Sequence, residues 1–219
     1  MPAAILTFRC DYPARGEADF NAWYDREHMP ERMALPGFRH AARYVAVGGK
    51  PKYLTVYEVA GPATLKSKAY LARLDDPTPW TQKIMRRVRN ASRTVYRRTG
   101  DAGRGCGAAA ATLEYALPDA RTAARIERRM AALARAPGIA RVQLWRSDPG
   151  LSDLDTAESR LRGDAGTPER WCLFVEASAA AALQAALSRH ADTAALRRAG
   201  ATGVRRRRYR LMLTMARGS

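Results

Sequence analysis

The 219-residue sequence has few cysteines and no long hydrophobic run. Its three cysteines, Cys10, Cys106 and Cys172, are an odd number with no CxxC spacing and no nearby histidine cluster, so they encode neither a disulfide framework nor a zinc site. No stretch approaches the roughly 18 apolar residues that span a bilayer, and the N-terminus lacks the basic segment of a signal peptide. These absences predict a cytoplasmic protein with no membrane partner and no metal site.

Acidic residues are scarce relative to basic ones, with 21 Asp and Glu against 38 Lys and Arg and a net charge of +17. Such a balance raises nucleic acid as a partner. The excess is spread evenly, however, with 19 basic and 10 acidic residues up to position 105 and 19 and 11 after it. Because no basic tail or domain stands apart, we expect no nucleic-acid partner.

Several motifs of well-known chemistries are also missing. The sequence has no GxGxxG, P-loop, HExxH or GxSxG pattern and no Cys-His nucleophile signature. Nucleotide-dependent, zinc-protease and acyl-enzyme chemistry are therefore disfavoured, and we expect no cofactor.

A regular order of short strands and helices is what the sequence does contain. The first half predicts a strand over 4–10, a helix capped by Asp19 and interrupted by Pro30, strands over 38–47 and 53–59 joined by a glycine-rich hairpin, a helix over 62–74, a short helix over 80–88 and a strand over 93–98. This order is βαββαβ, as in ferredoxin-like folds.

The second half repeats the order after a glycine-rich joint at 100–107. The turn Ala136-Pro137-Gly138 stands 101 residues after Leu35-Pro36-Gly37, and the strand that begins at Trp171 stands 118 residues after the one that begins at Tyr53. Matching turns and strands at nearly constant spacing predict a duplication.

The difference of 17 residues between these spacings predicts an insertion at 149–168. Because it is rich in acidic residues and glycine, and because the first half needs only a tight hairpin there, we expect a mobile, solvent-facing excursion outside the sheet. A helix over 178–198 and a strand over 204–215 complete the copy, so the predicted units are 1–102 and 107–219.

The predicted class is therefore α+β, with two tandem ferredoxin-like repeats. Each antiparallel sheet would carry helices on one face only, so its other face needs a partner. Two such sheets within one chain can face each other as an intramolecular barrel, with a lumen between them in which a small-molecule ligand would bind. A homodimer of such units stays open.

One stretch carries a family resemblance: residues 20–32, with the sequence FNAWYDREHMPER, followed by Leu35-Pro36-Gly37-Phe38, Arg43-Tyr44 and the strand that begins at Tyr53. This pattern resembles the dimeric α/β-barrel superfamily, and within it the EthD-like and stress-responsive A/B-barrel proteins. The resemblance covers most of the first half, whereas the second half is similar in element order and turns only. The superfamily includes monooxygenases, isomerases, polyketide cyclases and haem-using enzymes, so the fold alone does not define the function.

His28 is the strongest candidate for a catalytic residue. It stands three residues after Asp25 and four after Tyr24, which places all three on neighbouring helical positions. Asp25 could then fix the imidazole tautomer while His28 moves a substrate proton. The alternative is a structural role, in which His28 caps a helix C-terminus or hydrogen-bonds the Pro36-Gly37 turn. The second half has Ile126 and Arg129 at the equivalent positions, so we expect at most one site per chain.

Polar and aromatic side chains on the predicted strands could line the ligand site. The candidates for substrate binding are Tyr24, His40, Tyr44, Tyr53, Tyr57 and Trp80. Residues 53, 55 and 57 share one strand face because side chains alternate along a strand. Ordinary packing in the sheet, or a hydrophobic plug in the case of Trp80, is the alternative explanation.

The resemblance and these residues together predict a small-molecule enzyme that transfers a proton on an aromatic or polyketide-like compound without a cofactor. His28 would be the acid-base and Asp25 its orienting partner. A lone histidine could hold haem in such a barrel, but this reading is disfavoured. The alternative function is a non-catalytic ligand-binding or interaction protein on the same fold.

Overall fold

A computed structural model describes residues 3–152, 155–162 and 169–217 of the chain. Over these ranges, eight antiparallel strands form a closed barrel in the order β1-β3-β2-β8-β5-β7-β6-β4. The strands are β1 (Ala4–Asp11), β2 (Phe38–Ala46), β3 (Tyr53–Val59), β4 (Arg89–Gly103), β5 (Ala109–Ala116), β6 (Ile139–Ser147), β7 (Trp171–Ala177) and β8 (Thr202–Ala216). The two βαββαβ halves face each other within one polypeptide, which confirms the predicted fold class.

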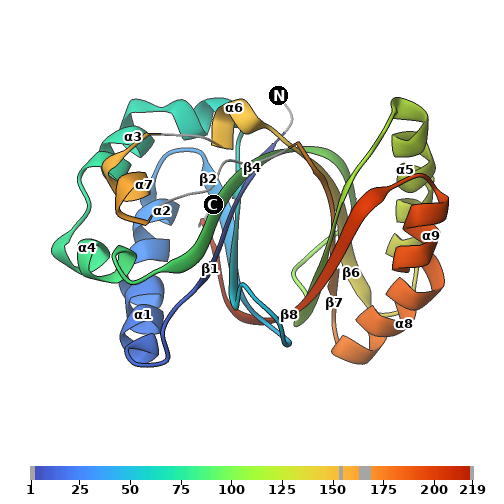
Figure 1. Ribbon diagram of the computed structural model, residues 1–219, viewed down its shortest axis with the longest axis horizontal. Helices are drawn as coiled ribbons and strands as arrows, with labels where there is room; N and C mark the ends of the chain where they lie inside the picture. Colours follow the sequence, from blue (N-terminus) through green and yellow to red (C-terminus); the bar gives the residue numbers. More distant parts are fainter. Residues whose placement is uncertain (1–2, 153–154, 163–168, 218–219) are drawn as a thin grey trace.

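Helices cover the barrel on two opposite sides (Figure 1). The described helices are α1 (Glu17–Trp23), the π-helix η1 (Tyr24–His28), α2 (Met29–Ala34), the 3-10 helix η2 (Pro62–Lys66), α3 (Lys68–Asp75), α4 (Pro79–Met85), α5 (Ala120–Ala134), α6 (Pro149–Ser152), α7 (Ala157–Arg162), α8 (Ala180–His190) and α9 (Thr193–Arg198). Helices α1 to α4 lie on one side and α5, α8 and α9 on the other. Helices α6 and α7 belong to the second half in sequence but lie among the helices of the first.

The strands β4 and β8 close the barrel because each is shared between the two sheets. Strand β4 has 15 residues and pairs with β1 and then with β6, while β8, also 15 residues long, pairs with β5 and then with β2. The expected strand over 93–98 was therefore too short, and residues 100–103 of the expected joint are strand. Their backbone groups pair with β6, which leaves neither sheet with an open edge at this junction.

The helix after β1 differs from its prediction at both ends. It begins at Glu17, after Gly16 in a left-handed conformation with φ 106°, so Asp19 is not the cap. Pro30 does not break it, because the backbone widens to a π-helix over 24–28, where the N–H of Met29 donates to the carbonyl of Tyr24. Pro30 then falls in the first turn of α2, where its missing N–H costs no hydrogen bond.

The insertion is helical and packed rather than solvent-facing over its described part. Leu151, Ser152, Thr156 and Glu158 are all buried, and the segment contacts β4, α3 and α4. It lies outside the sheet, as expected. The residues 153–154 and 163–168 of the predicted insertion lie outside the described residues. Composition was a poor guide because the packing partners of this segment belong to the other half of the chain.

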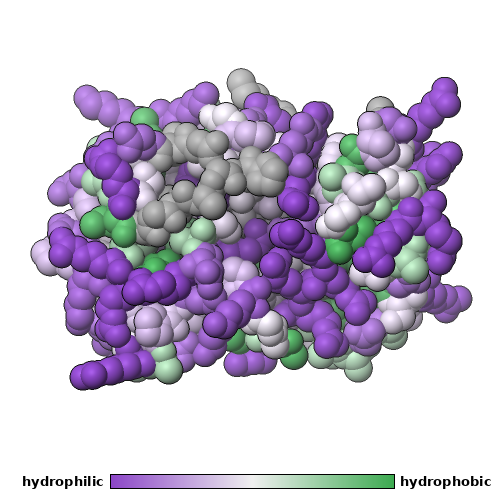
Figure 2. Space-filling view, in the orientation of Figure 1, coloured by the Kyte–Doolittle hydropathy of each residue, from purple (hydrophilic) through white to green (hydrophobic). Residues whose placement is uncertain are grey.

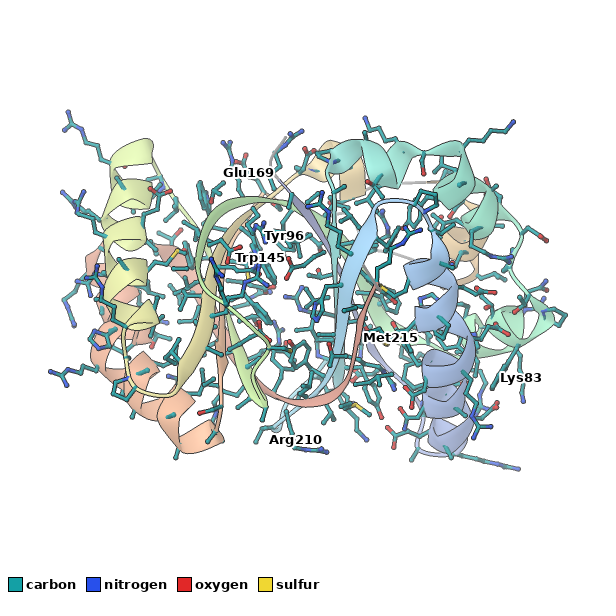
Figure 3. All side chains as sticks on the ribbon, turned by 180° about the vertical axis from the view of Figure 1, so that it is seen from behind. Lys83, Tyr96, Trp145, Glu169, Arg210 and Met215 are labelled. Carbon is teal, nitrogen blue, oxygen red and sulfur yellow. The ribbon has the colours of Figure 1, made fainter. Side chains whose placement is uncertain are left out.

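Side chains fill the lumen between the two sheets. The buried apolar and aromatic residues that point into it are Ile5, Ala42, Tyr44, Leu54, Val56, Tyr96, Ala110, Trp145, Cys172, Phe174 and Tyr209. Tyr96 and Trp145 meet there from different halves, with 5.6 Å between ring centroids (Figure 3). The buried Arg9 and Glu114 add an ion pair of 2.5 Å. The described residues of the expected ligand lumen thus form a buried cluster.

Candidate functional site

A small polar cavity lies between the sheet and the helices of the first half. Its volume is about 20 Å³, which is room for little more than one water molecule. Seven elements contribute its lining, namely β1, η1, α2, β3, α3, β4 and α7. The lining residues are Leu6, Phe8, His28, Arg32, Tyr57, Tyr70, Leu74, Arg93 and Glu158. We call this the His28 pocket.

His28 is the last residue of the π-helix η1 and is buried, with 5% of its surface exposed. Its imidazole packs against the Trp23 ring at 4.4 Å between centroids and against the edge of Tyr24 at 5.0 Å. The π-helical turn adds a residue to the turn before Pro30 and so changes the direction in which the following side chains point. Such turns occur frequently at functional sites.

Arg32 is buried one helical turn after His28 and lies in an ion pair with Glu158 of α7. The Arg32 Nη2 to Glu158 Oε2 distance is 2.5 Å, and both side chains are almost fully buried. Burial by itself lowers the pKa of this guanidinium, but the Glu158 carboxylate outweighs that effect and holds the pKa above its usual value. Arg32 therefore remains charged inside the protein.

Arg93 on β4 anchors the inserted segment to the wall of the pocket. Its Nη1 donates to the carbonyls of Leu151 at 2.9 Å and Ser152 at 2.8 Å, and its Nη2 donates to the Tyr70 hydroxyl at 3.4 Å. The Ser152 hydroxyl also accepts a hydrogen bond from the backbone N–H of Val95 at 3.0 Å. A buried guanidinium thus satisfies the C-terminal carbonyls of α6, which have no partner within so short a helix.

Tyr57 on β3 supplies a buried phenol. Among the described residues, its hydroxyl has no hydrogen-bond partner. Burial, with a further contribution from neighbouring Tyr24, raises the pKa of this phenol well above its usual value. Tyr57 is therefore a neutral hydrogen-bond donor at physiological pH.

The expected pairing of Asp25 with His28 is wrong. The Asp25 carboxylate is about half exposed and lies 3.3 Å from Nη1 of Arg43, with which it forms an ion pair. Tyr24 packs on the other side of that guanidinium, which lies 4.2 Å from its ring centroid. Asp25 and His28 are three positions apart, but the π-helical turn changes the angle between them relative to an α-helix.

The other expected ligand-binding residues lie in different places. The Tyr53 hydroxyl donates to Glu17 at 2.6 Å, the Trp80 indole donates to Asp19 at 3.1 Å, His40 shares a 2.8 Å hydrogen bond with Thr214, and Tyr44 lies in the lumen and donates to Glu176 at 2.8 Å. Of the predicted set, only His28 and Tyr57 line the His28 pocket. Residues 53, 55 and 57 do share a strand face, but that face points to the helices and not to the lumen.

The pocket also contains residues that the sequence prediction missed. Arg32, Tyr70, Arg93 and Glu158 are the polar members of this group. Arg32 stood four residues after His28 and could have been placed on the same helical face. Arg93 and Glu158 lie far from His28 along the chain and carry no local signal that would connect them to it.

The arrangement brings a buried imidazole, two guanidiniums and a phenol to one water-poor cavity. A group of this kind can stabilise negative charge on an oxygen while the imidazole exchanges a proton, because electrostatic interactions are strong where water is excluded. Over the described ranges, no group of three or more His, Cys, Asp or Glu residues could hold a metal ion. None of the described helices is long and apolar enough to cross a membrane.

Comparisons with known proteins identify the fold. No protein-family model matches the sequence, and no curated protein shows significant similarity to it. Among solved structures, a candidate monooxygenase from Fusobacterium nucleatum subsp. nucleatum matches with a TM-score of 0.66 at 9% identity, over 100% of this chain and 96% of that chain. An anthrone oxidase-like protein matches with a TM-score of 0.67 at 11% identity, over 100% and 94% of the two chains.

A candidate chlorite dismutase is a more distant structural neighbour, with a TM-score of 0.55 at 12% identity over 97% of this chain and 96% of that chain. At identities this low, the likeness establishes the fold and not the activity. The chain has the dimeric α/β-barrel fold, as the resemblance of its first half implied. Both halves of the barrel come from one polypeptide.

Proposed function

We propose that the protein is a small-molecule enzyme that transfers a proton in the His28 pocket, on an aromatic or polyketide-like compound and without a cofactor. The observation that carries this proposal is the position of the His28 imidazole in one buried cavity with Arg32 and Arg93. The names of the structural neighbours, a candidate monooxygenase and an anthrone oxidase-like protein, are compatible with a substrate of this class.

Each residue has a defined role in the proposed reaction. His28 takes a proton from a C–H bond that is acidic because it is conjugated with a carbonyl, and the bonding electrons move to the carbonyl oxygen as an enolate forms. The charged Arg32 guanidinium and the neutral Tyr57 hydroxyl stabilise that oxygen. His28 then returns the proton at a second position, which completes an isomerisation without an oxidant.

Hydrogen exchange at carbon tests the proposal with anthrone as the probe, because its C10–H bond is acidic and lies opposite a ketone. We expect the protein to accelerate C10 exchange in D2O, as measured by NMR. We expect His28→Gln to reduce the acceleration by about 100-fold or more, the usual contribution of an acid-base group. His190→Gln in α8 is the matched control, since His190 lies in the other half of the chain.

The melting temperature of His28→Gln separates catalysis from a structural role. A wild-type melting temperature with lost exchange supports the catalytic role. Unchanged exchange with a lowered melting temperature would leave His28 as a packing residue of the Trp23 and Tyr24 cluster.

A non-catalytic ligand-binding or interaction protein on the same fold is the second candidate, and the small volume of the pocket favours a role without turnover. At about 20 Å³ the cavity holds no organic ligand in this conformation. If anthrone binds and shifts NMR resonances of the pocket without any accelerated exchange, this second function replaces the first.

A further inference from the structure

We infer that the Glu158 carboxylate occupies the position in which an acidic group of the ligand binds, so that the ligand is a small aromatic molecule with one carboxylate. The inference rests on the proposed function only in that it concerns the same pocket. It adds the chemical class of the ligand and assigns a specificity-determining role to Arg32, with Glu158 as an internal competitor.

Glu158 comes from a different half of the chain than the rest of the pocket. The other polar residues of the pocket belong to the first half, namely His28, Arg32, Tyr57, Tyr70 and Arg93. Glu158 instead lies on α7 of the inserted segment, 126 residues from Arg32. The inserted segment is seen among the first-half helices in Figure 1. The pocket of one half is thus completed by a single carboxylate from the other.

The buried Arg32 guanidinium needs a negatively charged partner. A guanidinium buried this deeply requires an anion, because an unpaired buried charge is strongly unfavourable. Glu158 supplies the anion at 2.5 Å, while Glu31 is more distant at 3.8 Å and partly exposed. The Arg32 Nη1 atom has no hydrogen bond to any described residue, so the guanidinium retains a donor for a second oxygen. A carboxylate can replace Glu158 on Arg32 through two parallel hydrogen bonds.

The His28 pocket is too small for an organic ligand while Glu158 lies in it. A cavity of about 20 Å³ admits an organic ligand only if a lining side chain leaves, and displacement of Glu158 removes both its volume and its charge. Arg93 donates hydrogen bonds to the carbonyls of α6. Arg32 is therefore the guanidinium that we expect to bind the anionic group of the ligand. The remaining walls are apolar or aromatic, formed by Leu6, Phe8 and Leu74 together with the phenols of Tyr57 and Tyr70. These walls fit a flat apolar body, and the Arg32 guanidinium, whose present partner is one carboxylate, fits one carboxylate of the ligand.

Binding of benzoate and of its neutral analogue benzamide tests the inference, by isothermal titration calorimetry on the full-length protein. We expect Glu158→Gln to bind benzoate at least tenfold more tightly than the wild type, since the internal competitor has lost its charge. Benzamide should bind the two proteins equally. Glu169→Gln is the matched control, because Glu169 forms an exposed pair with Arg146 and should leave both affinities unchanged.

Two further measurements keep the test informative if Glu158→Gln folds poorly. The double variant Arg32→Gln with Glu158→Gln removes both charges, and we expect it to bind benzoate and benzamide alike. In the wild type, benzoate should shift the Nε–H resonance of Arg32 in NMR spectra, whereas benzamide should not.

The inference is overturned if Glu158→Gln gains affinity for benzamide as much as for benzoate, because the pocket would then only have become more open. It is also overturned if neither affinity changes or if the Arg32 resonance does not respond to benzoate. These outcomes are separable from the proposed function: carboxylate selectivity without anthrone exchange removes the proton-transfer proposal alone, and exchange without carboxylate selectivity removes this inference alone.

Discussion

The buried tyrosines of β3 show how burial and hydrogen bonding define the role of single residues. Tyr53 and Tyr57 lie on the same strand face, four residues apart. Tyr53 donates to the Glu17 carboxylate at 2.6 Å, whereas the Tyr57 hydroxyl has no partner among the described residues. A buried hydroxyl without a partner contributes nothing to stability, because it has lost its hydrogen bonds to water. In the proposed function, this hydroxyl is free to donate to the ligand.

A pair of substitutions tests this difference between the two tyrosines. Tyr57→Phe should leave the free energy of unfolding within about 0.5 kcal/mol of the wild type and lower the acceleration of anthrone exchange. Tyr53→Phe should lose about 1.5 to 3 kcal/mol, because a hydrogen bond to a carboxylate is removed. Urea denaturation measures both. A large loss of stability in Tyr57→Phe would show that its hydroxyl has a structural partner.

At the scale of elements, the segment α1-η1-α2 is the one that positions His28. Its apolar residues Phe20, Trp23 and Met29 pack on the sheet, and Glu27 ties it to α4. The Glu27 carboxylate accepts hydrogen bonds from the Trp23 indole at 3.0 Å, Thr78 at 2.6 Å and Thr81 at 2.9 Å. The π-helical turn is thus held from outside the pocket, which fixes the direction of the His28 side chain inside it.

The structure of the inserted segment predicts slow amide exchange, whereas its composition predicted a mobile, solvent-facing segment. The amides of Leu151 and Ser152 both donate to the carbonyl of Asp148 at 3.1 Å, and both residues are buried. We expect their hydrogen exchange to be roughly 100-fold slower than that of Gly49 in the exposed β2-β3 turn. Amide exchange followed by NMR measures this ratio. Equal exchange rates at Leu151, Ser152 and Gly49 would contradict this expectation and support the solvent-facing segment predicted from the acidic residues and glycines.

At the scale of the whole molecule, the lumen joins the two halves, and the His28 pocket lies on the helix side of the sheet. Rings from both halves interleave there, including Trp145 stacked on Phe174 at 4.7 Å and Tyr44 against Tyr209 at 6.4 Å. Hydrophilic residues dominate the outer face seen in Figure 2, while the lumen also holds the buried ion pair of Arg9 with Glu114. The buried rings of the barrel interior therefore stabilise the molecule, and the groups of the proposed function lie in the layer outside it.

The ion pair of Arg9 on β1 with Glu114 on β5 joins the halves inside this core. Both side chains are buried, and removal of Arg9 leaves Glu114 only its longer ion pair with the partly exposed Arg207, at 3.4 Å. Arg9→Met should therefore reduce the free energy of unfolding by about 3 kcal/mol, and addition of Glu114→Leu should recover most of the loss. Urea denaturation of the single and double variants tests this. Losses that simply add would show that the two residues are not coupled.

The sequence by itself determined the duplicated architecture and the alternation of strand faces. Turns such as Leu35-Pro36-Gly37 and Ala136-Pro137-Gly138 punctuate the chain locally, and their spacing preserves the order of elements in both halves. Period-two alternation likewise placed Tyr53 and Tyr57 on one face. His28 could be selected from the sequence because Tyr24 and Asp25 stand within one helical turn of it, and Tyr24 does pack against its ring.

Only the tertiary structure decided which face of each sheet forms the lumen and which residues meet around His28. Alternation along a strand states that two side chains point the same way, but it does not state toward which layer. The pairing of Arg32 with Glu158 joins positions 126 residues apart, and it exists because the inserted segment crosses to the helices of the other half. The spacing of Asp25 and His28 misled for a related reason. It was interpreted as that of an α-helix, whereas the chain forms a π-helical turn before Pro30, and residue spacing alone does not predict such a turn.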